Sequence, residues 1–433
     1  MQNVTAPCLD SFCRLDRLGL TVIEQIVDPD HTVLVCAPTT PAAPCPDCTG
    51  RGARYDTVTR RLAHVPFGWK PTTLHIRVPR YRCKDCARVW RHDVRAAAPT
   101  RGKLSRDAVT LAVKHIVIDR LSIARIADIL GVAWNTCSDA ILASAEELLF
   151  HDPTRLEGVT TIGVDEHVWR HTRFGDKYVT VIIDLTPTRT DTGPSRLLAM
   201  IPGRTKQAFK SWLEAQTPAF RDGVEIVAMD GFTGYKSAAV EAIDDVITVM
   251  DPYHVVALAG EKLDQCRQRI QQDTLGHRGR SGDPLYGIRR LARTRAALLR
   301  PKQWFRLLDV FRDDCHALFE ITWEVYQRVI DSYRAPDPVE GKQIMTALIE
   351  AIGTDVPAAL AEVRTLGKTL HRRQVDILAF FDHPGTSNGP SEAINGLIEH
   401  LRGTARGFRN LTHYIARSLL DAGGFRPLIH SYL

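Results

Sequence analysis

Acidic side chains on two predicted strands are the groups in this sequence best placed for chemistry. Asp165 lies midway along an apolar strand pattern at residues 161–169, and Asp230 ends another at residues 224–230. Two carboxylates close together in apolar surroundings repel each other unless a cation lies between them. Carboxylate oxygens favour Mg²⁺, or Mn²⁺ in its place, so we expect a divalent metal at this pair.

The order of the predicted elements makes those two strands neighbours. Strands at 161–169, 178–185 and 196–201 are followed by a helix at 205–216, a strand at 224–230, a helix from residue 233 and a strand at 245–251. This order indicates a ribonuclease-H-like mixed α/β core, in which the first and fourth strands are parallel neighbours. Asp165 can therefore lie beside Asp230.

A third acid should arrive on a helix late in the chain. Residues 386–399 combine a capping residue, a first-turn proline and apolar residues spaced by three and four. Glu392 and Asn395, three residues apart, share a face that can point toward the two aspartates. Glu399, one heptad later, is the alternative third acid.

Four cysteines in two pairs predict a structural metal site. Cys45 and Cys48 form one Cys-x-x-Cys pair and Cys83 and Cys86 the other, with 34 residues between them. Four thiolates satisfy the tetrahedral preference of Zn²⁺ and leave no position for water, so the zinc would be structural. The alternative is a redox or purely structural dithiol. Alternating residues and a turn at 66–69 predict β-hairpins between the pairs.

The cysteine segment is also basic. Net charge is +6 overall, whereas residues 51–106 hold 15 Lys and Arg against 3 Asp and Glu. This distribution favours a polyanionic partner bound through one end of the chain. The candidates for phosphate contacts near the second cysteine pair are Arg77, Arg80, Arg82, Lys84 and Arg88. The alternative is that these side chains only solvate a small domain.

The segment after the basic region has the pattern of a helix-turn-helix. A short helical pattern at residues 121–130 is followed by Gly131 and by a second helix that opens with polar groups. The predicted base-reading positions in its first turns are Trp134, Asn135, Thr136 and Ser138. Arg125 on the first helix is a candidate phosphate contact or a solvated surface arginine. A plain helical bundle can produce the same pattern.

Composition excludes several classes of protein. Ten cysteines in 433 residues are too few for a disulfide scaffold. No apolar run approaches the ~20 residues that cross a bilayer, and the first residues lack the order of a secretory signal. We therefore expect no membrane partner and a cytoplasmic, nucleoid-associated location.

Taken in order, these motifs resemble the IS-L-three family of insertion-sequence transposases. The resemblance runs through both cysteine pairs, the helix pair and the segments at 163–166, 229–232, 251–256 and 388–395, and it is most specific at 405–410. It implies a DDE transposase, named for its three acids, in which Asp165, Asp230 and Glu392 bind the catalytic metal. The family usually has a basic residue where Glu399 stands, which makes Glu399 a less suitable catalyst.

The same resemblance implies partners and further contacts. Double-stranded DNA, as element ends and as target, would be the substrate, and a homodimer or higher homo-oligomer would assemble on it because two ends are cut together. Arg406 and Arg409 in the closing segment are candidate DNA contacts, and His254 could position a phosphate.

The sequence thus predicts a multidomain α+β protein. The expected parts are a zinc ribbon at 1–100, a helix-turn-helix at 101–157, the first part of the core at 158–272, a helical insertion at 273–380 and the C-terminal helices of the core at 381–433. Three alternatives remain open: a DNA-binding regulator, an inactive remnant, and a nuclease that hydrolyses DNA without joining it.

Overall fold

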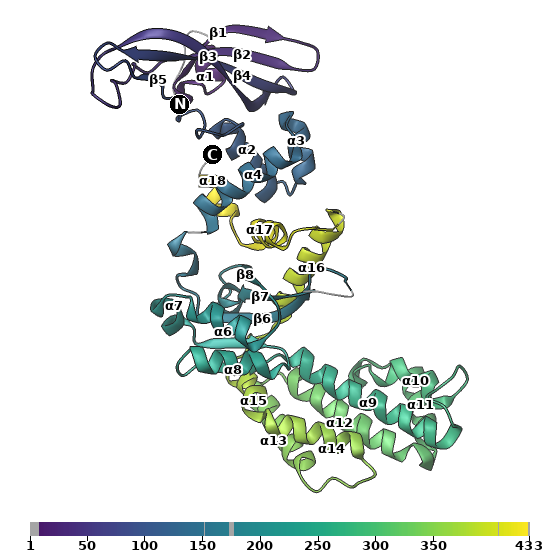
Figure 1. Cartoon of the computed structure of the whole chain (residues 1–433). Helices are drawn as coiled ribbons and strands as arrows, with labels where there is room; N and C mark the ends of the chain where they lie inside the picture. Colours follow the sequence, from purple (N-terminus) through teal and green to yellow (C-terminus); the bar gives the residue numbers. More distant parts are fainter. Residues whose placement is uncertain (1–7, 151, 173–176, 406, 432–433) are drawn as a thin grey trace. The chain divides into compact units, whose positions relative to one another are not determined.

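The protein is described here by a computed structural model that covers residues 8–150, 152–172, 177–405 and 407–431. Its contacts divide the chain into two units, one formed by residues up to Arg155 and from Ala416 onward, the other by Leu156–Ile415 (Figure 1). We expected the whole of 381–433 to belong with the core. Instead, the residues from Ala416 onward group with the N-terminal unit.

A five-stranded sheet forms the first part of the N-terminal unit. Its elements are α1 (Leu9–Phe12), η1 (Asp16–Leu18), β1 (Leu20–Val27), β2 (Thr32–Pro38), β3 (Gly52–Phe67), β4 (Lys70–Cys83) and β5 (Val89–Arg91). The strand order is β1-β2-β4-β3, with β5 paired to β4, and only β2 and β4 run parallel. The long β3–β4 hairpin turns at Gly68 and Trp69, both at positive φ, where the sequence predicted a turn.

Helices complete the N-terminal unit. They are α2 (Arg106–Val117), α3 (Ile123–Leu130), α4 (Trp134–Ala145), η2 (Glu146–Phe150), η3 (Pro153–Leu156), which ends at the unit boundary, and α18 (Arg426–Ser431). The Ser122 side chain caps α3, and Gly131 ends it in the left-handed conformation at φ 64°. The α3–α4 pair is bent by 109°. Among the described residues, no single helix has the length and apolarity to cross a membrane; only this bent pair passes on those two criteria.

The second unit contains a mixed sheet with the strand order β10-β9-β6-β7-β8. Its strands are β6 (Thr161–Val168), β7 (Tyr178–Asp184), β8 (Arg196–Pro202), β9 (Ile226–Met229) and β10 (Ile247–Met250). The connecting helices are α5 (Thr186–Arg189), α6 (Lys206–Glu214), α7 (Pro218–Gly223) and α8 (Thr233–Ala242). As predicted, β6 and β9 are parallel neighbours, while β6–β7 and β7–β8 are antiparallel. Phe209, Leu213 and Tyr235 from α6 and α8 pack on one face.

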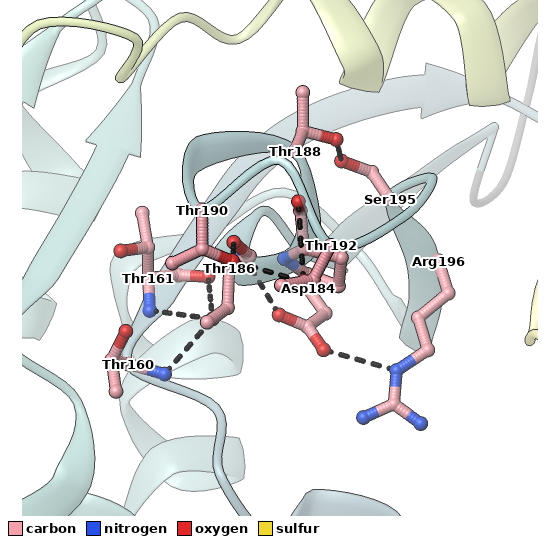
Figure 2. A network of polar contacts seen from close by, with 10 residues as sticks. Thr160, Thr161, Asp184, Thr186, Thr188, Thr190, Thr192, Ser195 and Arg196 are labelled. Atoms are coloured by element: carbon pink, nitrogen blue, oxygen red, sulfur yellow. Dashed lines mark hydrogen bonds and ion pairs between the residues drawn. The ribbon is translucent and has the colours of Figure 1, made fainter.

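A polar network fixes the beginning of β6. The Thr186 hydroxyl accepts hydrogen bonds from the backbone N–H groups of Thr160 and Thr161, at 2.9 and 3.0 Å. Asp184 accepts from the backbone N–H of Thr186 and pairs with Arg196, at 3.0 Å in each case (Figure 2). Thr186, in the connection after β7, is thus bonded to the start of β6, and Asp184 is bonded to the start of β8. These contacts fix the position of β6, the strand that carries Asp165.

Helices fill the chain between β10 and the late acid. They are α9 (Pro252–Leu275), α10 (Pro284–Ala292), η4 (Ala296–Leu298), α11 (Pro301–Phe311), η5 (Asp314–His316), α12 (Ala317–Arg334), α13 (Pro338–Gly353), α14 (Ala361–Arg372) and α15 (Gln374–Asp382). They share one apolar core that includes Leu263, Trp323 and Leu366. The chain then returns through α16 (Gly389–Thr404) and α17 (Leu411–Ala422).

The contact between α13 and α14 gives a stability prediction. A Cβ added at Gly367 would lie 1.7 Å from the carbonyl oxygen of Ile352, so alanine must push two helix backbones apart. Gly367→Ala should lower the free energy of unfolding by about 1–3 kcal/mol. The matched control is Gly396→Ala in α16, where a Cβ meets no atom within 4 Å and alanine should stabilise by about 1 kcal/mol. Denaturant unfolding followed by circular dichroism measures both free energies. If the two alanine variants changed the free energy of unfolding by the same amount, Gly367 would not be a packing site.

Candidate functional site

The parallel register of β6 and β9 brings two acids together. Val164 on β6 pairs with Met229 on β9, and Asp165 and Asp230 are the residues that follow this pair. Residues opposite each other on neighbouring strands point to the same face of a sheet, so the two carboxylates are adjacent. Asp165 is 9% exposed, and Asp230 is half-buried where β9 has just ended.

Burial and mutual repulsion set the charge properties of this pair. Burial raises the pKa of Asp165 to about 6, and the neighbouring Asp230 carboxylate adds to the rise. Burial also raises the pKa of Asp230. His254, in the first turn of α9, opposes both shifts, which indicates that the imidazole lies near both acids. One oxygen of each acid is held by a backbone N–H, from Glu166 and Phe232 respectively, at 2.8 Å.

The first turns of α16 lie directly against β6. Asn395 Nδ2 donates to Asp165 Oδ2 at 3.0 Å, so one face of α16 reaches the buried acid as the residue spacing predicted. The close approach depends on Gly163, where a Cβ would lie 2.8 Å from Asn388 Oδ1 and 2.9 Å from Ser391 Oγ. The start of α16 is also held by the residue that caps α9, because the Asn388 backbone N–H donates to Asp251 Oδ1 at 2.8 Å.

Both candidates for the third acid lie on this helix, one on each side of Asn395 in the sequence. Glu392 is in the first turn of α16 and is exposed, three residues before Asn395. Among the described residues, the three carboxylates of Asp165, Asp230 and Glu392 do not form a group whose ligand atoms all lie within 4.8 Å of one another. Glu399 is also exposed and pairs with Arg402 one turn later. The structure therefore brings two acids together and carries the third on the adjacent helix.

The four cysteines of the two pairs form a compact group that could hold a metal ion. Their sulfurs all lie within 4.8 Å of one another, and neighbouring Sγ atoms are 3.4–3.6 Å apart. Zn–S bonds of about 2.3 Å in a tetrahedron separate sulfurs by roughly 3.8 Å, so the geometry fits zinc. Backbone N–H groups of Cys86 and Asp85 lower the pKa of Cys83 to about 7, whereas the pKa values of Cys48 and Cys86 are raised by the thiols beside them. The four thiols therefore titrate together, and a cation is needed for all of them to bind as thiolates.

The basic side chains around the cysteines are partly neutralised. Three of the five predicted phosphate contacts have acidic partners: Arg77 with Glu24 at 3.6 Å, Arg80 with Asp56 at 2.6 Å, and Arg88 with Asp47 at 3.6 Å. Arg82 and Lys84 are exposed and form no ion pair with the described part of the chain. Because side chains alternate along β4, Arg77 lies on the opposite face from Arg80 and Arg82.

The helix pair exposes most of its predicted contact residues. In the first turn of α4, Trp134 is 43% exposed, Asn135 is exposed and Thr136 is half-buried. Arg125 on α3 is exposed as well. The prediction that Ser138 contacts bases was wrong. Ser138 lies one turn further along α4 and is fully buried, because that face of the helix points into the interior of the N-terminal unit.

Two predictions concern the segment between α16 and α17. Arg409 is exposed there. Arg406 lies outside the described residues. The helical domain also contains basic residues with acidic partners, since Arg293 contacts Asp264 at 2.9 Å and Arg295 contacts Asp331 at 3.6 Å.

Comparison with known proteins covers both units. A profile described as "Transposase" matches residues 162–418, and one described as "zinc-finger of transposase IS204/IS1001/IS1096/IS1165" matches residues 41–86. The transposase for insertion sequence element IS1557 of Mycobacterium tuberculosis is 27% identical over 321 residues, which are 70% of this chain and 69% of the relative.

A second relative spans nearly the full length. The transposase for insertion sequence element IS1001 of Bordetella parapertussis is 23% identical over 418 residues, which are 92% of this chain and 94% of the relative. The transposase profile matches more than half of the chain and includes all three candidate acids. The match to the zinc-finger profile covers the four cysteines that the structure brings together. This chain therefore belongs to the IS-L-three family of insertion-sequence transposases.

Proposed function

We propose that this chain is a DDE transposase that binds the ends of an insertion sequence and cuts and rejoins DNA with Asp165, Asp230 and Glu392. The observation that carries the proposal is the β6–β9 register, which sets Asp165 beside Asp230. The strand order β10-β9-β6-β7-β8 supports a ribonuclease-H-like core, because it has the predicted three antiparallel strands and parallel continuation.

The two acids fit a divalent cation. Both have raised pKa values, so each is costly to ionise until positive charge lies between them. Mg²⁺ or Mn²⁺ bound there would supply charge stabilisation for the attacking and leaving oxygens of a phosphodiester. Asn395 orients one oxygen of Asp165 through its amide, and the first turn of α16 carries Glu392 on the same side. Completing the site would require Glu392 to approach the pair when metal and DNA bind.

The reaction proposed for this centre has two steps. Water attacks a phosphorus at the end of the element, and the 3′ oxygen leaves as a free hydroxyl. That hydroxyl then attacks a phosphorus in target DNA, and a target 3′ oxygen leaves. Neither step needs a covalent bond between enzyme and DNA.

The N-terminal unit would hold the element ends. The bent α3–α4 pair supports a helix-turn-helix, with Trp134 and Asn135 exposed for base contacts and Arg125 for phosphate. Among the five predicted phosphate contacts, Arg82 and Lys84 form no ion pair with the described residues, which makes them the strongest candidates of that set. Because two ends are cut together, we propose a homodimer or larger homo-oligomer on DNA.

Removing single acids tests the catalytic centre. Asp165→Ala, Asp230→Ala and Glu392→Ala should each reduce Mg²⁺-dependent nicking of labelled terminal-repeat DNA by more than about 100-fold. Gel-shift affinity for the same DNA should stay unchanged, because none of the three acids is a proposed end contact and the helix pair and cysteine cluster lie in the other unit. Glu399→Ala is the matched control on the same helix and should cut normally. A chain that shifts DNA but never cuts it would instead be a regulator.

The raised pKa of Asp165 gives a prediction that does not depend on activity. Folding raises this pKa from 3.8 to about 6. The carboxyl group therefore lowers the free energy of unfolding progressively as the pH rises from about 4 to 6, and by a constant amount at higher pH. Without metal, Asp165→Asn should therefore stabilise the protein by up to about 3 kcal/mol at pH 8 and by little at pH 4. Thermal unfolding at the two pH values measures this. Added Mg²⁺ should stabilise only the wild type; a less stable Asn variant at pH 8 would contradict the prediction.

The cysteine cluster predicts one structural zinc. Cys83→Ser should remove zinc detected by elemental analysis and lower affinity for end DNA at least about tenfold, because the end of the β3–β4 hairpin loses its clamp. Cys315→Ser, an exposed cysteine outside the cluster, is the control and should keep both properties. Full zinc content in the Cys83 variant would rule out this ligand set.

A further inference from the structure

A buried carboxylate outside the catalytic pair joins three elements around the Asp230 turn. Asp376 in α15 is 0% exposed. Its Oδ1 accepts from the Thr248 hydroxyl on β10 and lies beside Lys236 Nζ on α8, at 2.7 Å in both cases. Its Oδ2 accepts from Arg373 Nε at 2.6 Å. A buried charge is tolerated when it is paired and hydrogen-bonded in this way, so these contacts form a defined hub.

Arg373 extends from this hub to the catalytic turn. Its guanidinium is buried, with the residue 4% exposed, and Nη1 donates to the carbonyl oxygen of Gly231 at 3.0 Å. Gly231 directly follows Asp230, so this bond holds the backbone that carries the acid. Nη2 is buried without a hydrogen-bond partner among the described residues, so Asp376 does not use all of the arginine's donors.

The positive charge of Arg373 also acts on the acid itself. Burial is the main cause of the raised pKa of Asp230, and Arg373 is one of the groups that oppose the rise. Lys236 on α8 is the second cation paired with Asp376 in this hub. The hub therefore holds the turn after Asp230 through hydrogen bonds, from Asp376 to Arg373 and from Arg373 to Gly231.

We propose that Arg373 is a positioning residue that sets Asp230 for metal binding, with Asp376 holding the arginine in place. The inference rests on the proposed function, because it concerns the same metal site. It also assigns a role to the helical domain: its last helix, α15, braces the strand end that carries the second acid. The segment between the second and third acids thus becomes part of the scaffold of the catalytic centre.

Metal binding by the full chain tests this role. Mn²⁺ titrations followed by electron paramagnetic resonance would compare the wild type with Arg373→Met and Arg373→Lys. Loss of a residue that orients a metal ligand typically weakens metal binding 10–100-fold, so Arg373→Met should raise the dissociation constant at least about tenfold. Arg373→Lys keeps a positive charge near Asp376 but loses the branched guanidinium that also reaches the Gly231 carbonyl. It should weaken Mn²⁺ binding by a smaller factor.

Arg269→Met is the matched control. Arg269 forms a two-point pair with Glu362, at 2.8 and 2.9 Å, that joins α9 to α14 in the same helical domain. Its loss should lower the unfolding temperature without changing Mn²⁺ affinity. Equal Mn²⁺ affinity in Arg373→Met and wild type would overturn the inference, as would an equal weakening by Arg269→Met.

The remaining outcomes separate this inference from the proposed function. If Arg373→Met does not fold, Arg373→Lys decides, and wild-type affinity in that variant overturns the positioning role. If the wild type binds no Mn²⁺, or if Asp230→Ala binds it unchanged, the proposed metal centre fails and this inference fails with it. Wild-type binding that is lost in Asp230→Ala but unaltered in both Arg373 variants contradicts only the inference.

Discussion

The parallel pairing of β6 with β9 is the constraint on which the rest of the proposed centre depends. It sets Asp165 and Asp230 side by side at a point where both are partly removed from water. Two such carboxylates cost free energy when ionised, because each loses hydration and repels the other. The apo fold is therefore destabilised locally at the position where a cation would be held, which is the usual relation between stability and function at a metal site.

The neighbouring elements are arranged around that pair. Gly163 leaves room for the first turns of α16, Asn395 binds an oxygen of Asp165, and His254 begins α9 beside both acids. On the other side, Arg373 and Asp376 connect the turn after Asp230 to α15. The helices between the second and third acids consequently act on the site from both of their ends, through the charge of His254 in α9 and through the hydrogen bond of Arg373 beside α15.

The N-terminal sheet is small and has little apolar surface to bury, so it needs a further source of stability. The cysteine cluster joins the start of β3 and the end of β4 at the open end of a long hairpin. Its basic residues are less available than a count of charges indicates, since Arg77, Arg80 and Arg88 each face an acid of the same unit. DNA binding by this unit would therefore depend more on the unpaired side chains and on α4 than on net charge.

Much of this architecture could be predicted from the amino-acid sequence alone. Strand and helix periods, the Gly131 helix end and the two cysteine pairs follow from interactions among residues close in the chain or from the spacing of ligands. The order of the sheet was inferred from the succession of strands and helices, because few topologies accommodate it. These signals were sufficient to identify the family and to place Asp165 near Asp230. Only the tertiary structure decided the burial of Ser138, the pairing of the basic residues, the exposed position of Glu392 and the Arg373–Asp376 hub. Those features depend on which side chains from distant segments meet on packing, and local periodicity carries no information about such meetings.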